Sequence, residues 1–237
     1  MNFQDHSLGY YVDLIDAGEP YSFVRYGDGE YQRMIPGLRD KVRLQEPELS
    51  AALVGTVQSP HDGRYFVASQ PKDTLHKLGC REPVVRWVDA NVPGILWHNG
   101  DVFHRASGKG TLYPLVRALH EHKTVVVGPS WLTALPFYDA FIEIPHDTQR
   151  GHTFDSRSWS MIEQFQEQIV KHKDCIVSVS CGAAAKVLIH RLHTEMSPHS
   201  WMIDFGSLWD VYCGHLSRRY HHSMDDETIA RNLGVAA

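Results

Sequence analysis

The sequence predicts an α/β fold of the Rossmann-like type, with a mostly parallel sheet and helices on both of its faces. Short, continuously apolar segments alternate along the chain with longer amphipathic ones. Strands that are apolar on both faces are typical of buried parallel sheets. Polar loops that contain glycine follow several of these strands, and no repeat or low-complexity linker interrupts the alternation. We therefore expect a single domain over residues 1–237.

In the first half of the chain, the spacing of apolar residues and the positions of glycines predict the helices and strands. Residues 3–17 have amphipathic spacing and end at Gly18, a common helix terminator, so we expect a helix there. Residues 21–26 are apolar and aromatic and run into Gly27, which predicts a strand. By the same criteria we expect helices at 48–58 and 83–90 and strands at 65–68 and 94–97.

The second half shows clearer alternation. The β-branched run 124–127 predicts a strand, followed by Gly128-Pro129-Ser130 and a short helix through Leu135. Asp155 is expected to cap a helix over 158–172. The remaining expected elements are strands at 141–144, 175–180 and 201–203 and a helix over 182–193.

Composition narrows the class of protein. Hydrophobic residues make up 43% and charged residues 22%, as in globular proteins with a large core. The net charge of −5 argues against a surface that coats nucleic acid generally, although a local basic patch remains compatible. No apolar run of about 18 residues and no secretion signal is present. Four cysteines without Cys-x-x-Cys spacing indicate a reducing cytoplasm, that of the host cell if the source is viral.

The predicted fold also places the candidate site. In open α/β sheets, ligands bind in the crevice at the carboxyl ends of the strands. Any chemistry should therefore come from the loops that follow the strands, which are residues 27–30, 98–105, 128–131, 180–184 and 204–210.

The first of these loops carries two carboxylates one residue apart. Asp28 and Glu30 follow the strand in Arg-Tyr-Gly-Asp-Gly-Glu, and oxygen ligands of this kind suit Mn²⁺ or Mg²⁺. Such an ion stabilises the charge that grows on a departing diphosphate. Gly27 and Gly29 let the backbone approach a bound ligand.

Two alternatives for this loop stay open. Asp28 and Glu30 can instead cap the next helix at the end of a tight polar turn. A dinucleotide-binding loop with the pattern Gly-x-Gly-x-x-Gly is the other, but Gln32 stands where its third glycine should be.

Four segments together resemble the GT-D-type glycosyltransferases, whose hallmark is an Asp-x-Glu motif after the first strand. The resemblance implies a glycosyltransferase that moves a hexosyl or pentosyl group from a nucleotide-sugar, with UDP-glucose the expected kind of donor. It also implies that Asp28 and Glu30 bind the metal and the nucleotide-sugar. It spans about residues 20–212, and its segments are 23–30, 125–130, 178–188 and 202–210.

Other polar residues of the predicted loops suit the remaining steps of such a reaction. Gly182 lies between a buried strand and a helix, where free N–H groups favour a phosphate, although it can also simply permit a tight turn. Arg25 and Arg105 are cationic candidates for the diphosphate or the acceptor, and an ion pair of Arg25 with Asp28 or Glu30 is the structural alternative. For the general base we expect Asp204 first and Asp210 second, with His98 and His104 as weaker options; Asp204 can equally cap the helix expected after Gly206.

The acceptor stays open between a glycan or glycoprotein and a hydroxymethylated pyrimidine in DNA. The basic aromatic segment 215–222, with Arg150, His152 and Arg157, is compatible with phosphate contacts, and a frayed polar C-terminus is the alternative. Two rival functions are a Rossmann-like methyltransferase, which needs no divalent metal, and a noncatalytic nucleotide-binding module. A homodimer is compatible with the sequence.

Overall fold

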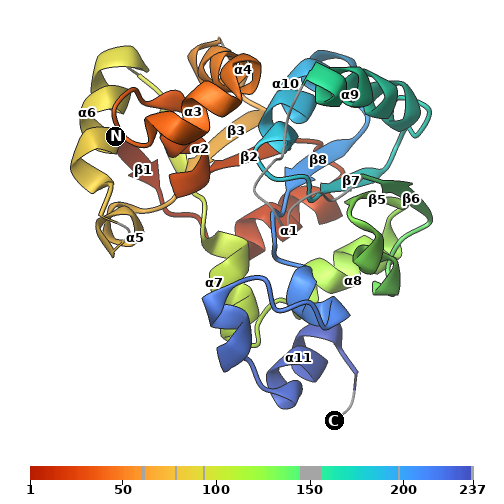
Figure 1. Ribbon diagram of the computed structural model, residues 1–237. Helices are drawn as coiled ribbons and strands as arrows, with labels where there is room; N and C mark the ends of the chain where they lie inside the picture. Colours follow the sequence, from red (N-terminus) through yellow and green to blue (C-terminus); the bar gives the residue numbers. More distant parts are fainter. Residues whose placement is uncertain (60–61, 78, 93, 145–155, 197, 236–237) are drawn as a thin grey trace.

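The structure is a computed structural model. It describes residues 1–59, 62–77, 79–92, 94–144, 156–196 and 198–235. In this part of the chain, eight strands form one sheet in the order β1-β4-β3-β2-β8-β7-β5-β6 (Figure 1). Every neighbouring pair of strands runs parallel. The predicted α/β fold with a parallel sheet is therefore confirmed. The strands are β1 (Asn2–Gln4), β2 (Ser22–Tyr26), β3 (Tyr65–Ser69), β4 (Leu96–Asn99), β5 (Thr124–Gly128), β6 (Ala140–Glu143), β7 (Ile176–Val179) and β8 (Trp201–Asp204).

Helices cover both faces of this sheet (Figure 1). Two clusters of buried side chains, one on each face, attach the helices to the sheet. One face carries α2 (Asp28–Met34), α4 (Pro47–Gln58), α5 (Lys72–Lys77), α6 (Arg81–Asn91), α9 (Ser156–Ile169) and α10 (Ala184–Met196). The other face carries α1 (Leu8–Asp16), α7 (Val102–Gly108), α8 (Tyr113–Glu121) and the short 3₁₀ helices η1 (Ser130–Ala134) and η2 (Asp210–Cys213).

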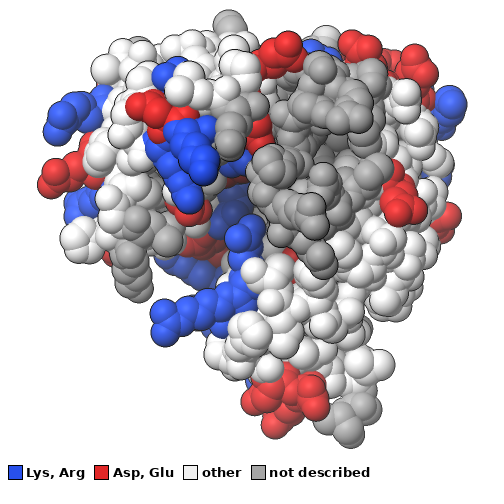
Figure 2. Space-filling model, in the orientation of Figure 1, with Lys and Arg blue, Asp and Glu red and all other residues white. Residues whose placement is uncertain are grey.

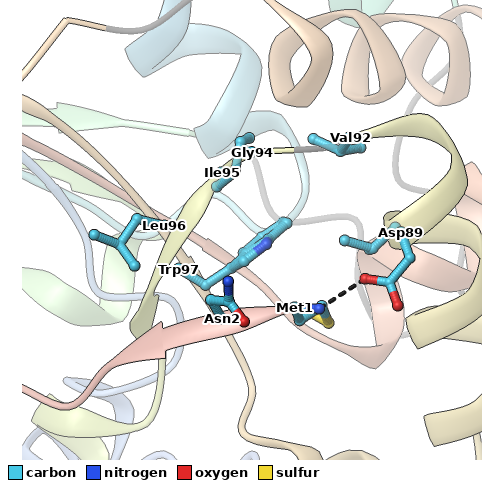
Figure 3. A pocket seen from close by; sticks show the side chains of 9 residues that line it. Met1, Asn2, Asp89, Val92, Gly94, Ile95, Leu96 and Trp97 are labelled. Carbon is cyan, nitrogen blue, oxygen red and sulfur yellow. Dashed lines mark hydrogen bonds and ion pairs between the residues drawn. The ribbon is translucent and has the colours of Figure 1, made fainter.

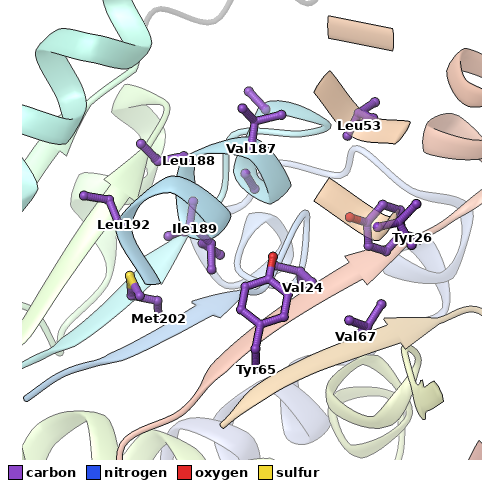
Figure 4. Close-up of a cluster of buried hydrophobic side chains, with 14 of the residues drawn as sticks. Val24, Tyr26, Leu53, Tyr65, Val67, Val187, Leu188, Ile189, Leu192 and Met202 are labelled. Carbon is purple, nitrogen blue, oxygen red and sulfur yellow. The ribbon is translucent and has the colours of Figure 1, made fainter. Parts of the chain in front are cut away.

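The first of these clusters lies between β2, β3 and β8 on one side and α4 and α10 on the other (Figure 4). Leu53 of α4 and Tyr26 of β2 are fully buried there, and the Tyr26 hydroxyl bonds Thr56 Oγ1 at 2.8 Å. Truncation of a buried leucine such as Leu53 to alanine costs about 2–5 kcal/mol, because it leaves a cavity. The helices that frame the carboxyl edge are thus held by ordinary apolar packing.

The predicted elements of the second half are confirmed with shifts of a few residues at their ends. The prediction for residues 3–17 is wrong at its start, because residues 2–4 form β1 and only Leu8–Asp16 are helical. The edge strand β1 pairs in parallel with β4, so that Phe3 lies opposite Trp97. This pairing overrides the helical spacing that begins at Phe3. The predicted cap Asp155 lies outside the described residues.

The chain after η2 packs against the rest of the protein. It contains η3 (Arg219–Ser223) and α11 (Asp226–Leu233), which lie below α7 and α8 in Figure 1. Asn232 of α11 is fully buried, accepts from Leu112 N–H at 2.8 Å and donates to Ser107 O at 2.7 Å. Within the segment 215–222, Ser217 Oγ donates to Asp210 and Arg218 Nε donates to Ser207 Oγ, so the alternative of a frayed C-terminus is wrong for these residues. Among the described helices, none is long and apolar enough to cross a membrane.

Candidate active site

The carboxyl ends of β2 and β8 lie side by side in the middle of the sheet. The chain runs outward from β2 to β3 and β4 on one side, and later fills the other side with β5, β7 and β8. The loop after β2 and the loop after β8 therefore meet where the order of the strands reverses, which is the position at which α/β sheets bind ligands. The structure brings Asp28, Glu30 and Asp204 to this edge, as the sequence predicts.

The loop after β2 turns directly into α2. Asp28 is the first residue of this helix and Glu30 lies in its first turn. Glu30 Oε2 reaches back and accepts the Gly27 N–H at 2.8 Å, while the Asp28 N–H donates to Gln70 Oε1 at 2.9 Å. The capping alternative is confirmed for Glu30. Acidic residues in a first turn also oppose the positive end of the helix dipole, which favours helix formation immediately after the strand.

Lys186 of α10 lies at the centre of the site. Its Nζ is 2.9 Å from Glu30 Oε1 and 2.8 Å from Asp204 Oδ2, and it donates to Gly182 O at 3.1 Å. The ammonium group has three N–H donors, and these three acceptors match them. Lys186, Glu30 and Asp204 are all buried. One lysine thus ties the first turn of α2, the end of β8 and the turn before α10 together.

The charges of this cluster stabilise one another. Burial alone lowers the pKa of Lys186, but the carboxylates of Asp204 and Glu30 outweigh it and raise that pKa. Burial alone raises the pKa of Glu30, but the charge and hydrogen bond of Lys186 and the Gly27 N–H bring it down to about 2. Glu30 and Lys186 are therefore both charged at neutral pH. We call Lys186, Glu30 and Asp204 the buried charge cluster.

The sequence analysis did not assign Lys186, although a signal was present. Lys186 interrupts the otherwise apolar run Ala183–Ile189 at the start of α10. A lysine within a helix face that must be buried needs anionic partners, because an unpaired buried charge is costly. The two carboxylates predicted for the same crevice are those partners.

Arg25 points to a different partner from the one expected. Its Nε donates to Gly100 O at 2.7 Å and its Nη2 lies 3.2 Å from Asp101 Oδ1. The structural alternative, an ion pair of Arg25 with Asp28 or Glu30, is therefore wrong: the side chain turns toward the loop after β4 and pairs with Asp101. Its side chain is 20% exposed and its Nη1 lies near Gly206, so it still borders the crevice.

Asp28 is the residue of the motif whose carboxylate is best placed to meet a ligand. It is half-buried, and none of the described residues bonds to its carboxylate. Both oxygens of Glu30, in contrast, are already bonded by Lys186 and Gly27. No group of three or more metal-binding side chains occurs among the described residues. One free carboxylate suits Mg²⁺ or Mn²⁺ nonetheless, since these ions often take one or two carboxylates and fill their shell with waters and substrate phosphates.

The turn before α10 offers polar groups that suit a phosphate. Gly182 has φ +60°, adopts the left-handed conformation and is exposed, with open space around the position of a Cβ. Ser180 Oγ, at the end of β7, is buried and has no hydrogen-bond partner in the described part of the chain. The N-terminus of α10 follows, and its free N–H groups and dipole favour an anion.

The two predicted bases are both engaged. Asp204 is 1% exposed; its Oδ1 accepts the Gly206 N–H at 3.1 Å, while its Oδ2 bonds Lys186. Asp210 accepts from Trp131 Nε1 at 3.0 Å and from Ser217 Oγ, which joins η1 to the C-terminal segment. The Gly206 bond closes a turn, and no helix begins there. Proton acceptance by Asp204 or Asp210 stays a prediction, and it requires these bonds to open.

His98 is buried beside α1 and does not face the crevice. Its Nδ1 lies 2.8 Å from the Tyr11 hydroxyl and its ring stacks on Phe66. Burial, with a smaller contribution from His6, lowers the pKa of His98 to about 4. His98 thus stays neutral in the folded protein under conditions in which it is protonated in the unfolded chain.

This shift predicts a pH dependence of stability. Between the unfolded pKa near 6.5 and the folded pKa of about 4, the unfolded chain binds the additional proton, so stability falls as pH falls through this window. We expect His98→Gln to remove on the order of 1–2 kcal/mol of the stability difference between pH 6.5 and pH 4.5. Urea unfolding of both proteins at the two pH values measures it. An unchanged difference in the variant contradicts the assignment.

Gly100 allows the loops after β3, β4 and β2 to meet. A Cβ at this position would lie 2.8 Å from Ser69 C and 3.2 Å from Arg25 Cγ. We expect Gly100→Ala to lower the unfolding free energy by about 1–3 kcal/mol, because the Ser69 backbone cannot yield without breaking the 2.7 Å bond from Gly100 N to Ser69 O. Denaturant titration measures this. Gly108→Ala is the matched control, since no atom lies within 4 Å of the added Cβ.

The opposite edge of the sheet holds other hollows. A cavity of about 350 Å³ lies at the amino ends of β1 and β4, where the N-terminal amine of Met1 pairs with Asp89 at 2.7 Å (Figure 3). On the same edge, Ser22 Oγ bonds His193 Nδ1 at 2.8 Å and His193 Nε2 lies 3.0 Å from Asp62. This Ser-His-Asp chain resembles a hydrolase triad, but Ser22 is fully buried and cannot reach a substrate. We therefore place the site at the carboxyl edge.

Comparison with known proteins supports this fold. No family model matches the chain, and no curated protein matches its sequence. Three solved structures are similar, with 13–16% identity. One is described as "the highly conserved domain of unknown function 1792 has a distinct glycosyltransferase fold" and has a TM-score of 0.63 over 88% of this chain and 79% of its own. Another is described as "a new glycosyltransferase (DUF1792) from Streptococcus sanguinis" and has a TM-score of 0.61 over 87% and 82%. The third is a selenomethionine-substituted structure of domain of unknown function 1792, with a TM-score of 0.62. The chain therefore shares the fold of these three proteins.

Proposed function

We propose that this protein is a glycosyltransferase that uses a nucleotide-sugar, with a UDP-sugar as the expected donor. The observation that carries the proposal is the convergence of Asp28, the buried charge cluster and the Gly182 turn at one crevice. The shared fold with proteins described as glycosyltransferases supports it. At 13–16% identity the fold gives no sugar, nucleotide or acceptor, so these rest on the residues of the site.

The reaction joins an acceptor hydroxyl oxygen to the anomeric carbon of the sugar. The bond from that carbon to the diphosphate breaks, the diphosphate leaves with the electron pair, and the hydroxyl proton passes to a base. Asp28 would hold Mn²⁺ or Mg²⁺, and Glu30 would join as a second ligand only by releasing Lys186. The bound ion supplies neutralisation of the charge that develops on the leaving diphosphate.

The remaining residues of the site would bind the diphosphate and hold the carboxylates in position. The Gly182 turn and the N-terminus of α10 suit the diphosphate, and Ser180 Oγ is an additional donor at the same place. Lys186 is a positioning residue, because it fixes Glu30, Asp204 and the Gly182 carbonyl in one arrangement. Arg25, held by Asp101, borders the crevice beside Gly206.

A thermal-shift panel tests the proposal. The full-length protein is heated with UDP-glucose, other nucleotide-sugars and S-adenosylmethionine, each with and without Mn²⁺. Binding to the folded state raises the midpoint by mass action, and a ligand at about 100 times its Kd adds about 2.7 kcal/mol. We expect a nucleotide-sugar to stabilise the protein more with Mn²⁺ than without it, and to be slowly hydrolysed.

Other results point to the rival functions. Stabilisation by S-adenosylmethionine without any metal requirement would indicate a methyltransferase and contradict the proposal. Binding of a nucleoside diphosphate with Mn²⁺ but no hydrolysis of any nucleotide-sugar would indicate a noncatalytic module.

A further inference from the structure

One wall of the crevice is built by α7 and the chain segment 215–223, which we call the arginine wall. The rings of His104 on α7 and Tyr220 on η3 lie 5.8 Å apart. Arg218 Nε donates to Ser207 Oγ at 3.1 Å, which joins this segment to the loop after β8. The wall therefore stands directly beside the loop that carries Asp204 (Figure 1).

Positive charge gathers on this wall. Arg105 of α7 and Arg218 and Arg219 at the start of η3 are exposed, and Arg25 lies deeper in the crevice. None of the described carboxylates pairs with Arg105, Arg218 or Arg219. Figure 2 shows Lys and Arg side chains around the hollow in the middle of this face, with acidic atoms deeper inside. The protein as a whole has a net charge of −5, so this cluster is a local region of positive charge on a negatively charged protein. Such a region attracts an anion.

The same wall holds buried polar atoms without partners. In the described part of the chain, His104 Nδ1, Tyr220 OH and His221 Nε2 are buried and make no hydrogen bond, and His221 as a whole is 1% exposed. Because these atoms are buried, they lie behind the surface of the wall and do not themselves contact a ligand. The exposed arginines come from two separate segments of the chain, α7 and residues 218–219, and the contact between the His104 and Tyr220 rings holds these segments together.

We propose that the arginine wall binds the phosphodiester backbone of a nucleic-acid strand, which presents the acceptor hydroxyl to the crevice. This inference rests on the proposed function, since the strand would be the acceptor of the transferred sugar. A single small anion would need only Arg25, which lies deeper in the crevice. Three exposed arginines outside it, Arg105, Arg218 and Arg219, match an anion whose charges repeat along a chain.

The aromatic residues of the segment support a nucleic acid over another polyanion. Tyr220 directly follows Arg218 and Arg219 along the chain, and Trp131 stacks on His215 with 4.2 Å between the ring centroids. Base stacking on aromatic side chains beside a basic groove is the common way in which proteins bind single strands. Arg150 and His152, which the sequence adds to this patch, lie outside the described residues, as does the side chain of Arg157.

The proposal predicts a salt dependence. If about three phosphates are neutralised, the logarithm of the association constant falls with the logarithm of salt concentration with a slope of about −2 for a single strand. Removal of two of the three arginines reduces the slope to about −0.7 and raises the Kd at low salt by about tenfold or more.

Fluorescence anisotropy of a labelled 12-nucleotide single strand, without donor, tests the inference. The variant pair Arg105→Gln, Arg219→Gln leaves the Arg218–Ser207 bond intact, so that a folding defect is separable from lost charge. The matched control removes the same charge elsewhere through Arg81→Gln, Arg86→Gln, two exposed arginines of α6. We expect the first pair to lose affinity by about tenfold and the control pair to bind like the wild type.

Three results overturn the inference. An equal loss of affinity in both double variants would show that the wall binds no nucleic-acid strand. The absence of binding by the wild type at 50 mM salt would show the same. Binding of heparin through the same arginines, without binding of the oligonucleotide, assigns the wall to an anionic glycan. Donor binding by the wild type in the thermal-shift panel is measured separately, so that failure of the proposed function is distinguishable from failure of this inference.

Discussion

Replacement of Lys186 by methionine is expected to lower the unfolding free energy by about 3–5 kcal/mol. Methionine fills a similar volume but supplies no charge, so Glu30 and Asp204 remain buried beside each other without a cation. Removal of one partner from a buried ion pair is far more costly than removal of a surface pair, because the remaining charges stay out of water. The three residues of the buried charge cluster are at most 9% exposed, so we expect the high cost of a buried pair here.

Urea unfolding and thermal melts measure this loss, which corresponds to a fall in the thermal midpoint of roughly 10 °C for a chain of this size. Lys171→Met is the control, because Lys171 is exposed and its replacement removes the same charge from the same protein. The double change Lys186→Met, Glu30→Gln should recover part of the loss, because it also removes the Glu30 carboxylate that Lys186→Met leaves without its cation. Equal midpoints for Lys186→Met and the wild type would show that the buried charge cluster does not hold the site together.

Replacement of Asp28 by asparagine is expected to lower kcat/KM for sugar transfer or donor hydrolysis by about a hundredfold or more. A hundredfold loss corresponds to about 2.7 kcal/mol of transition-state stabilisation, within the several kcal/mol that a bound divalent ion supplies. The change keeps the size of the side chain and the backbone bond from Asp28 N–H to Gln70. Stability should therefore change by no more than about 0.5–1 kcal/mol, the usual contribution of an acidic residue near a helix N-terminus.

The decisive measurement is the additional stabilisation that Mn²⁺ gives to the donor complex. It should disappear in Asp28→Asn, and a chelator should reduce the wild type to the level of the variant. Asp226→Asn is the matched control, since Asp226 is also the first residue of a helix, α11, and lies exposed on the surface. Full Mn²⁺-dependent stabilisation in Asp28→Asn would remove Asp28 from the proposed metal site.

The sequence predicted the parts of this protein that depend on local pattern. Apolar segments such as 124–127 must be buried on both faces, so the parallel sheet and its helices follow from hydrophobicity alone. The convergence of Asp28 and Asp204 also followed, because carboxyl ends of parallel strands share one edge. The strand β1 was missed because its three residues gain their structure from pairing with β4, which no local spacing reports.

Only the tertiary structure decided which charges meet. The positions of Arg25 and Lys186 in the sequence show that each needs an anion, but not which one. In the fold, Lys186 pairs with Glu30, which lies more than 150 residues before it in the chain, and with Asp204, which lies almost 20 residues after it. Arg25 pairs with Asp101. It also folds residues 215–233 back onto α7 and α8, so that a segment with no clear periodicity becomes one wall of the crevice. Local pattern fixes which residues must be buried, whereas the partner of a buried charge depends on which loops the order of the strands brings together.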